Sequence, residues 1–152
     1  MDGTMDINSA LNDVLVKLFR NINAIEEQAI RTDEYKDVTT NDMHVIEAIG
    51  MDEKKNMTAV AKSLHVTTGT LTISVNSLVK KGYVDRIRSE EDRRVVLISL
   101  TEKGKKAFIH HRSFHEEMIN TIVEQLSEEE KRVLEKALSS ILHFFLSRRK
   151  DL

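Results

Sequence analysis

Hydrophobic residues recur at helical spacing over three long stretches of this chain. From Ile7 to about Ile30 the apolar stripe consists of Leu11, Val14, Leu15, Leu18, Phe19, Ile22 and Ile25. A second stretch follows Thr101 to about Gln125, and a third begins at a capping box on Ser127 and runs through Leu146. This spacing places the apolar side chains of each stretch on one helix face. Because a chain of 152 residues offers these faces little cover, we expect a second copy of the chain to bury them.

Shorter helical patterns fill the middle of the chain. Thr39 and Asp42 have the spacing of a capping box at the start of a helix that runs to Gly50. After a charged connection over residues 51–56, Thr58 is placed to cap a short helix over residues 59–64.

A tight turn at residues 65–66 leads into the next helix, which begins at Thr67 or Thr68 and ends before Gly82. Glycine suits the left-handed backbone that often follows a helix. Short helix, tight turn and second helix are the layout of a helix-turn-helix. The helical period directs four apolar side chains inward, namely Leu71, Val75, Leu78 and Val79.

The opposite face of this helix is small, polar and free of acidic side chains. It carries Gly69, Thr70, Ile73, Asn76, Ser77 and Lys80. Such side chains let a helix approach base edges, and an Asn amide can pair with adenine. An ordinary solvated helix face would instead be rich in Glu and Lys. The pattern therefore favours a recognition helix for double-stranded DNA.

Alternating side chains after this helix predict two strands, over residues 83–88 and 94–100, with a charged tip between them. Arginines at such a tip can enter the minor groove and contact phosphate. Asp92 is placed to hold one of them in a bidentate pair. By itself the hairpin could equally be a solvated loop with weak surface ion pairs. The helix before it favours a DNA-binding wing.

Charge is unevenly distributed along the chain. The net charge is −2, yet residues 80–106 contain nine Lys/Arg and five Asp/Glu, a local +4. Local positive charge steers a protein onto phosphates. The chain has no cysteine, which excludes disulfides and thiolate metal sites. No apolar run is long enough for a membrane span and no secretory leader opens the chain, so we expect a cytoplasmic protein with no membrane partner.

No motif indicates catalysis or a cofactor. The five glycines are scattered, so no phosphate-binding loop is present. No Ser/His/Asp set has the sequence context of a catalytic triad. We therefore expect a protein that is not an enzyme and needs no cofactor.

The run from Gly82 to Arg94, with Leu100-Thr101-Glu102-Lys103-Gly104 after it, resembles the signature of the MarR family of bacterial regulators. The order of helices fits that family over nearly the whole chain. Within the family the chain is most similar to repressors of fatty-acid synthesis, through residues 42–44, 67–76 and 114–118. The resemblance implies a mainly α fold of six helices with a small β-wing, in one domain over residues 1–152.

The resemblance also assigns a role to each part of the chain. Residues 39–101 would form the winged helix-turn-helix, and residues 1–33 and 105–152 would pair two subunits on a palindromic operator. Together with the helix faces, it indicates the DNA-binding residues Thr67, Thr68, Thr70, Thr72, Ile73, Asn76, Ser77, Lys80, Arg88, Asp92, Arg93 and Arg94.

Similarity to the fatty-acid branch implies that long-chain acyl-acyl carrier protein acts as corepressor. An acyl chain needs an apolar slot, which we expect where the first, second and fifth helices converge. The candidate residues are Phe19, Ile22, Met43, His44, Phe114, His115 and Met118. The two histidines could donate to an acyl carbonyl or to the phosphopantetheine arm.

A metal sensor is the alternative on the same scaffold. His111 and His115 lie four residues apart on a helix and could bind one zinc ion, with Glu26 and His44 as further ligands. The MarR family has a zinc-sensing branch, but this chain lacks its long histidine run and its cysteine. Histidines that only hydrogen-bond at a helix interface, or a winged helix that binds only proteins, are the remaining alternatives.

Overall fold

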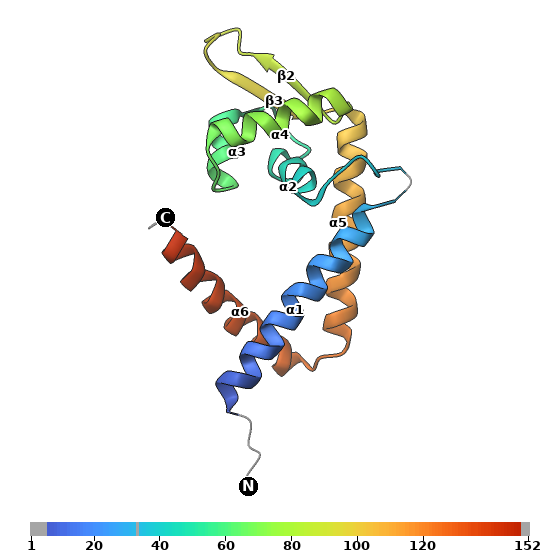
Figure 1. Cartoon of the computed structure of the whole chain (residues 1–152), viewed down its shortest axis with the longest axis vertical. Coiled ribbons are helices and arrows are strands. Elements are labelled where there is room, and N and C mark those ends of the chain that lie inside the picture. Colours follow the sequence, from blue (N-terminus) through green and yellow to red (C-terminus); the bar gives the residue numbers. More distant parts are fainter. Residues whose placement is uncertain (1–5, 33, 150–152) are drawn as a thin grey trace. The chain divides into compact units, whose positions relative to one another are not determined.

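Helices dominate the computed structural model, which describes residues 6–32 and 34–149. Residues 1–5, 33 and 150–152, at the edges of the predicted dimerisation segments, lie outside the described residues. The elements in chain order are α1 (Ile7–Ile30), α2 (Thr40–Ile49), β1 (Lys55–Asn56), α3 (Met57–Ser63), α4 (Thr68–Lys81), β2 (Val84–Arg88), β3 (Val96–Leu100), α5 (Glu102–Glu124) and α6 (Glu128–Arg149) (Figure 1). The predicted mainly α fold with six helices and a small wing is confirmed.

Contacts divide the chain into two compact units, residues 1–112 and 113–152. The first unit contains α1 to α4, the sheet and the first half of α5. The second contains the rest of α5 and α6.

Side-chain caps begin the helices where the sequence predicts them. In the α2 capping box, the Thr39 hydroxyl accepts from the Asp42 amide at 3.1 Å and the Asp42 carboxylate accepts from the Thr39 amide at 3.0 Å. The Thr67 hydroxyl accepts from the Thr70 amide at 3.1 Å and begins α4. Ser127 makes the predicted box before α6. These bonds satisfy amide donors that lack a partner within the helix.

The start of α3 differs from the prediction. The helix spans Met57–Ser63, and its cap is Asn56, whose side-chain oxygen accepts from the Thr58 amide at 2.7 Å. Thr58, the predicted cap, is thus the donor of this bond. Asparagine ranks above threonine as a helix cap, which is consistent with the earlier start.

The sheet has three antiparallel strands in the order β1-β3-β2. The sequence predicted only the hairpin, because β1 has two residues, too few for an alternating pattern. It pairs through Lys55 with Ile98 of β3. The hairpin strands are also shorter than predicted. Arg94 and Val95 belong to the turn, where the Val95 amide donates to the Asp92 carbonyl at 2.9 Å.

A core lies between α2, α3, α4 and the sheet. Its fully buried side chains include Met43, Ile46, Leu71, Leu78 and Ile98. Val79 was predicted to face this core, but it is 36% exposed. It lies roughly 80° around the helix from Leu71, at the border of the inward stripe.

Two glycines fix how the chain leaves the recognition helix. Gly82 has φ +84° and ends α4 in the predicted left-handed conformation. Gly104, in the first turn of α5, approaches the Tyr83 carbonyl so closely that a Cβ would lie 2.1 Å from that oxygen. Thr101 donates its hydroxyl to the Gly82 carbonyl at 2.6 Å. The start of α5 is therefore packed directly on the end of α4.

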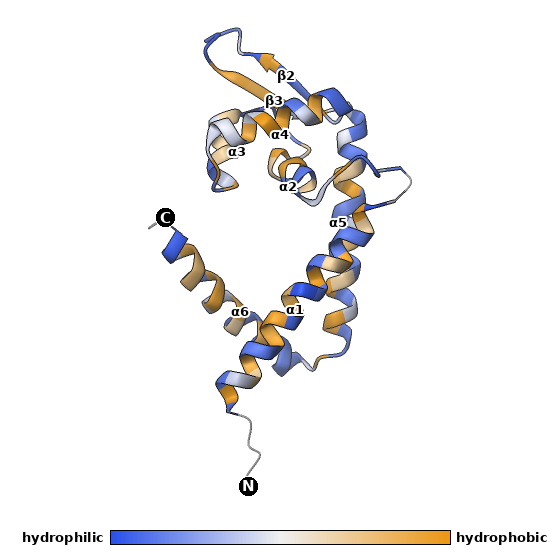
Figure 2. Cartoon of the chain, viewed as in Figure 1, coloured by the Kyte–Doolittle hydropathy of each residue, from blue (hydrophilic) through white to orange (hydrophobic). Residues whose placement is uncertain are grey.

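Hydrophobic residues recur along α1 and α6 (Figure 2), and many of their side chains are exposed. On α1, Phe19 is 71% and Val14 58% exposed, and on α6, Phe145 is 61% and Leu142 58% exposed. No described residue of α6 is buried. Exposed apolar side chains that gather on one helix are typical of surfaces that contact another protein. None of the described helices combines the length and the apolar character needed to cross a membrane.

Candidate nucleic-acid interface

The outward face of α4 is accessible over its whole length. Ile73 is 74% exposed. The other predicted reading residues are exposed (Thr67, Thr68, Thr70, Asn76 and Lys80) or half-buried (Thr72 and Ser77). Between Val66 and Val84 no acidic residue interrupts this surface. Its chemistry suits close approach to base edges and phosphates.

The wing tip is held in shape by its own polar bonds. Asp92 accepts from the Arg94 backbone amide at 3.0 Å and from the Arg94 guanidinium at 3.2 and 3.4 Å. These hydrogen bonds lower the pKa of the Asp92 carboxyl. Arg88 donates to the Arg93 carbonyl at 3.4 Å across the tip. The predicted bidentate pair is present, so this acid orients a wing arginine as well as carrying charge.

A groove of about 620 Å³ lies between the recognition helix, α3 and the wing. Thr68 and Thr72 of α4 line one side, and Arg86, Arg88 and Arg94 of the hairpin line the other; the remaining lining residues are Asn56, Met57, Thr58, Ile87, Val95 and Val96. Three guanidinium groups and several hydroxyls around one groove form a suitable contact for a nucleic-acid backbone.

Arg86 is a site residue that the sequence analysis missed. Its guanidinium donates to the side-chain oxygen of Asn76, the residue predicted to read a base. Arg86 and Arg88 are two residues apart on β2, so both lie on one face of the strand. The spacing of two residues between Arg86 and the predicted Arg88 is the feature of the sequence that could have identified Arg86 as a site residue. This bond uses one of the two lone pairs of the Asn76 amide oxygen, and the NH₂ group keeps both of its donors.

The predicted effector residues fall in both units of the chain. Phe19 and Ile22 lie on α1, and Met43 and His44 on α2, in the first unit. Phe114, His115 and Met118 lie on the part of α5 that belongs to the second unit. Met43 is fully buried in the core, whereas the side chain of His44 is half exposed.

Three of the four candidate metal ligands lie together in the first unit. His111 is 1% exposed, and its Nε2 lies 3.2 Å from Glu26 and 3.3 Å from Glu47. His44 Nε2 lies 3.7 Å from the same Glu26 oxygen. Glu26, near the end of α1, therefore lies close to one imidazole on α2 and one on α5, and Glu47 of α2 lies close to His111. The fourth candidate, His115, belongs to the second unit.

His110, another histidine of this region, has a structural role. Its Nε2 is 3.2 Å from the Ala29 carbonyl, and its ring lies 5.1 Å from that of Tyr35. It links α5 to the end of α1 and to the connection that follows it.

Comparison with known proteins agrees with this interface. The profile of the family described as Transcriptional regulator SarA/Rot matches residues 30–111, more than half of the chain. The uncharacterized HTH-type transcriptional regulator YpoP of Bacillus subtilis is 30% identical over 105 residues, which cover 69% of each chain.

Solved structures show the same relationship. Streptococcus pneumoniae FabT in complex with DNA is similar with a TM-score of 0.88 and 39% identity, over 92% of this chain and 98% of that one. A MarR family transcription regulator has the same fold, with a TM-score of 0.78 at 18% identity over 94% of this chain and 93% of that one. The predicted resemblance to MarR-type regulators is confirmed, and FabT is among the similar proteins. The chain belongs to the SarA/Rot family of DNA-binding, winged-helix transcriptional regulators.

Proposed function

We propose that this protein is a homodimeric repressor of fatty-acid synthesis genes, with long-chain acyl-acyl carrier protein as corepressor. The observation that carries the proposal is its similarity to FabT bound to DNA, which covers nearly the whole of both chains. It would work in the cytoplasm, on the chromosome.

Sequence-specific reading is assigned to the outward face of α4 and to the wing. The threonines, Ile73 and Asn76 offer methyl groups, hydroxyls and one amide to the major groove. Arg88, Arg93 and Arg94 offer cations to the phosphates and the minor groove. Asp92 is assigned no contact with DNA; its carboxylate holds the Arg94 guanidinium in place.

Pairing of two chains is assigned to α1 and α6, because both expose apolar side chains that a single chain leaves in water. A two-fold dimer presents two recognition helices, so its operator should be a near-palindrome. Half-sites should lie about 10 base pairs apart, or a multiple of that distance.

Control by an acylated carrier requires that the ligand bind the DNA-competent dimer better than the other form. The residues of the slot remain those predicted from the sequence, namely Phe19, Ile22, Met43, His44, Phe114, His115 and Met118. A typical coupling of about 1–3 kcal/mol would raise operator affinity roughly 5- to 150-fold.

Operator titration tests this proposal. The protein is titrated onto promoter DNA of fatty-acid synthesis genes, with long-chain acyl-acyl carrier protein, with free carrier protein, or with zinc. We expect tightening with the acylated carrier alone. Filling the slot with Met118→Trp should abolish that response and leave basal binding intact, with circular dichroism as the check on folding. Indifference to the acylated carrier would refute the corepressor assignment.

A zinc-responsive repressor is the second candidate, favoured by the Glu26 carboxylate, which lies near both His111 and His44. Imidazole nitrogens and carboxylate oxygens are ordinary zinc ligands, and in a tetrahedral site with bonds of about 2.0–2.2 Å they lie roughly 3.3–3.6 Å apart. The separation of 3.2 Å between Glu26 and His111 lies slightly below that range, and the 3.7 Å between Glu26 and His44 lies slightly above it. Zinc would tie the end of α1 to α2 and α5.

Zinc binding is separable from acyl control. Calorimetry with zinc alone should show a site that His111→Asn removes, and operator affinity should rise with zinc in the wild type only. His143, which lies on α6 away from the candidate ligands in sequence, provides the matched control as His143→Asn. Tightening by zinc together with indifference to the acylated carrier would favour the metal sensor.

A further inference from the structure

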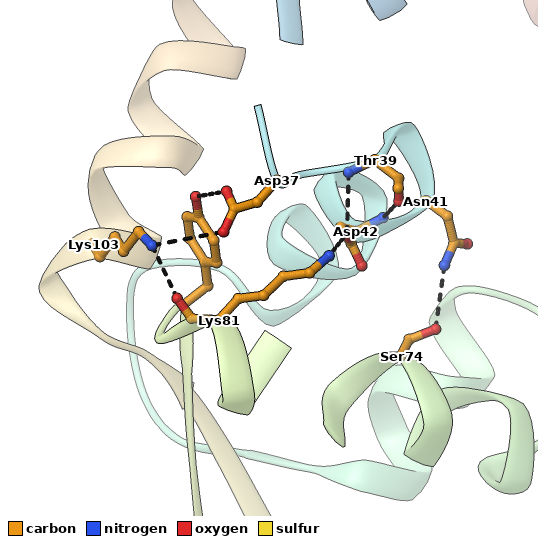
Figure 3. A network of polar contacts seen from close by, with 8 residues as sticks. Asp37, Thr39, Asn41, Asp42, Ser74, Lys81 and Lys103 are labelled. Atoms are coloured by element: carbon orange, nitrogen blue, oxygen red, sulfur yellow. Dashed lines mark hydrogen bonds and ion pairs between the residues drawn. The ribbon is translucent and has the colours of Figure 1, made fainter. Parts of the chain in front are cut away.

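Two neighbouring lysines end the recognition helix, and their surroundings differ. Lys80 is exposed, as expected of a residue that reaches a phosphate. The side chain of Lys81 is only 26% exposed, and its Nζ lies 2.8 Å from the Oδ2 of Asp42, which is 7% exposed (Figure 3). An ion pair this sheltered is screened much less by salt than a surface pair.

The Asp42 carboxylate is also held by a bond at the start of its own helix. As the third residue of α2, it accepts from the Thr39 amide at 3.0 Å within the capping box. One carboxylate therefore fixes the start of α2 and binds the end of α4. The Lys81 side chain thereby ties the end of α4 to the start of α2.

A second set of bonds holds the backbone at the same point. Lys103 of α5 donates to the Lys81 carbonyl at 2.9 Å, lies 4.2 Å from the centre of the Tyr83 ring and is 3.9 Å from Asp37 (Figure 3). The Tyr83 hydroxyl donates to Asp37 at 2.8 Å. Burial, and then this bond to Asp37, raise the pKa of Tyr83, so the phenol stays protonated as the donor.

A third contact lies farther along the same side of the recognition helix. Asn41 of α2 donates to the Ser74 hydroxyl at 3.2 Å. Ser74 and Lys81 are seven residues apart, about two helical turns, so they share one side of α4. The first residues of α2 thus contact α4 at two points along its length.

We propose that Lys81 is a positioning residue, which sets the orientation of the recognition helix through Asp42 and makes no phosphate contact. Its charge is used inside the protein, whereas the charge of Lys80 is available to DNA. The alternative role for a cation at the end of a recognition helix is a contact with a DNA phosphate. Positioning of the helix and contact with a phosphate predict different binding behaviour.

The salt dependence of binding distinguishes these roles. A lost phosphate contact reduces the salt slope by about one and weakens operator and scrambled DNA alike. A tilted helix instead loses base contacts, so it weakens operator binding and leaves scrambled DNA and the slope unchanged. The loss of one base contact corresponds to about 5- to 150-fold.

The experiment measures affinity for operator and scrambled DNA over a range of salt concentrations. Lys81→Met, which keeps the alkyl stem, should lower the ratio of specific to non-specific affinity about 5- to 150-fold at an unchanged slope. The matched control Lys80→Met should lower the slope by about one and leave the ratio unchanged. Asp42→Asn, which retains a cap acceptor and cannot touch phosphate, should reproduce Lys81→Met, and the double variant should lose no more than either alone.

A reduced slope with an unchanged ratio in Lys81→Met would make Lys81 a phosphate contact and overturn the proposal. An unchanged ratio in Asp42→Asn would overturn it as well, even if Lys81→Met failed to fold. The inference rests on operator recognition by α4. A wild type with no preference for operator over scrambled DNA would refute that proposed function, whereas a wild-type preference that survives both substitutions would refute only the role of Lys81.

Discussion

Asn76 illustrates how a predicted base-reading side chain can be preset by a neighbour. The Arg86 guanidinium engages its amide oxygen, which leaves the amide NH₂ as a donor. Bidentate recognition of adenine needs both a donor and an acceptor, whereas guanine and the thymine O4 offer acceptors only. We expect the Arg86 bond to weaken this oxygen as an acceptor for DNA and so to bias Asn76 away from adenine.

Arg86→Ala should release the Asn76 oxygen and shift the preferred base at the contacted position towards adenine. Binding-site selection with the wild type, Arg86→Ala and Asn76→Ala measures this shift. Asn76→Ala should relax that position and cost about 1–3 kcal/mol. The same preference in the wild type and in Arg86→Ala would show that Arg86 does not control the amide.

The wing gives a pH dependence at the scale of one residue. Arg94 lowers the pKa of Asp92 by hydrogen bonding to the carboxylate. Because the pKa of this carboxyl is lowered, the pair is fully present at pH values above the ordinary aspartate pKa of about 3.9. The pair is lost as the pH falls through the lowered pKa. Arg94→Ala should raise the pKa of Asp92 towards the ordinary value in an NMR titration. The same Asp92 pKa in the wild type and in Arg94→Ala would show that Arg94 does not hydrogen-bond to this carboxylate.

Sequence predicted the local bonds of these residues better than the distant ones. The caps at Thr39, Thr67 and Ser127 and the Asp92 pair join residues at most three apart. Arg86 with Asn76 and Lys81 with Asp42 join residues 10 and 39 apart. The spacing of residues along the chain does not predict these distant pairs, because they form only when the helices and the sheet pack together.

At the scale of elements, periodicity predicted the long helices and failed for short segments. The bounds of α1 agree with the predicted stripe, because seven apolar residues define one face. The two residues of β1 carry no pattern, and α3 begins before its predicted cap. The alternation of side chains predicted the two strands of the wing. The second strand was predicted to begin too early, because the charged Arg94 and the apolar Val95 of the turn continue the alternating pattern.

Gly104 tests how α5 is attached to the end of the recognition helix. Gly104→Ala would put a Cβ 2.1 Å from the Tyr83 carbonyl oxygen, so the backbone must shift. We expect the free energy of unfolding to fall by about 1–3 kcal/mol or more, measured by urea denaturation.

Gly69→Ala is the control for that substitution. The nearest atom to an added Cβ at Gly69 is the Thr67 hydroxyl oxygen at 3.8 Å, and a helix prefers alanine to glycine by about 1 kcal/mol. Equal destabilisation by both substitutions would refute the close approach of α5.

At the scale of the whole molecule, the exposed stripes of α1 and α6 imply pairing of two chains. Wild-type protein should sediment as a dimer at micromolar concentration, and Phe19→Glu or Leu142→Glu should shift it to monomer, because each places a charge among the apolar side chains of a proposed interface. Ile73→Glu, at an exposed apolar position on α4, should leave the dimer intact. A wild-type monomer that still binds operator tightly would contradict the pairing.

The central claim is that a dimer reads a specific sequence through α4 and the wing. Fluorescence anisotropy on one labelled near-palindromic operator and its scrambled version, at the same salt concentration, tests it most directly. We predict two chains per operator and an affinity for the operator at least about 10³-fold tighter than for scrambled DNA. Equal affinity for the two DNAs would contradict sequence-specific recognition by this surface.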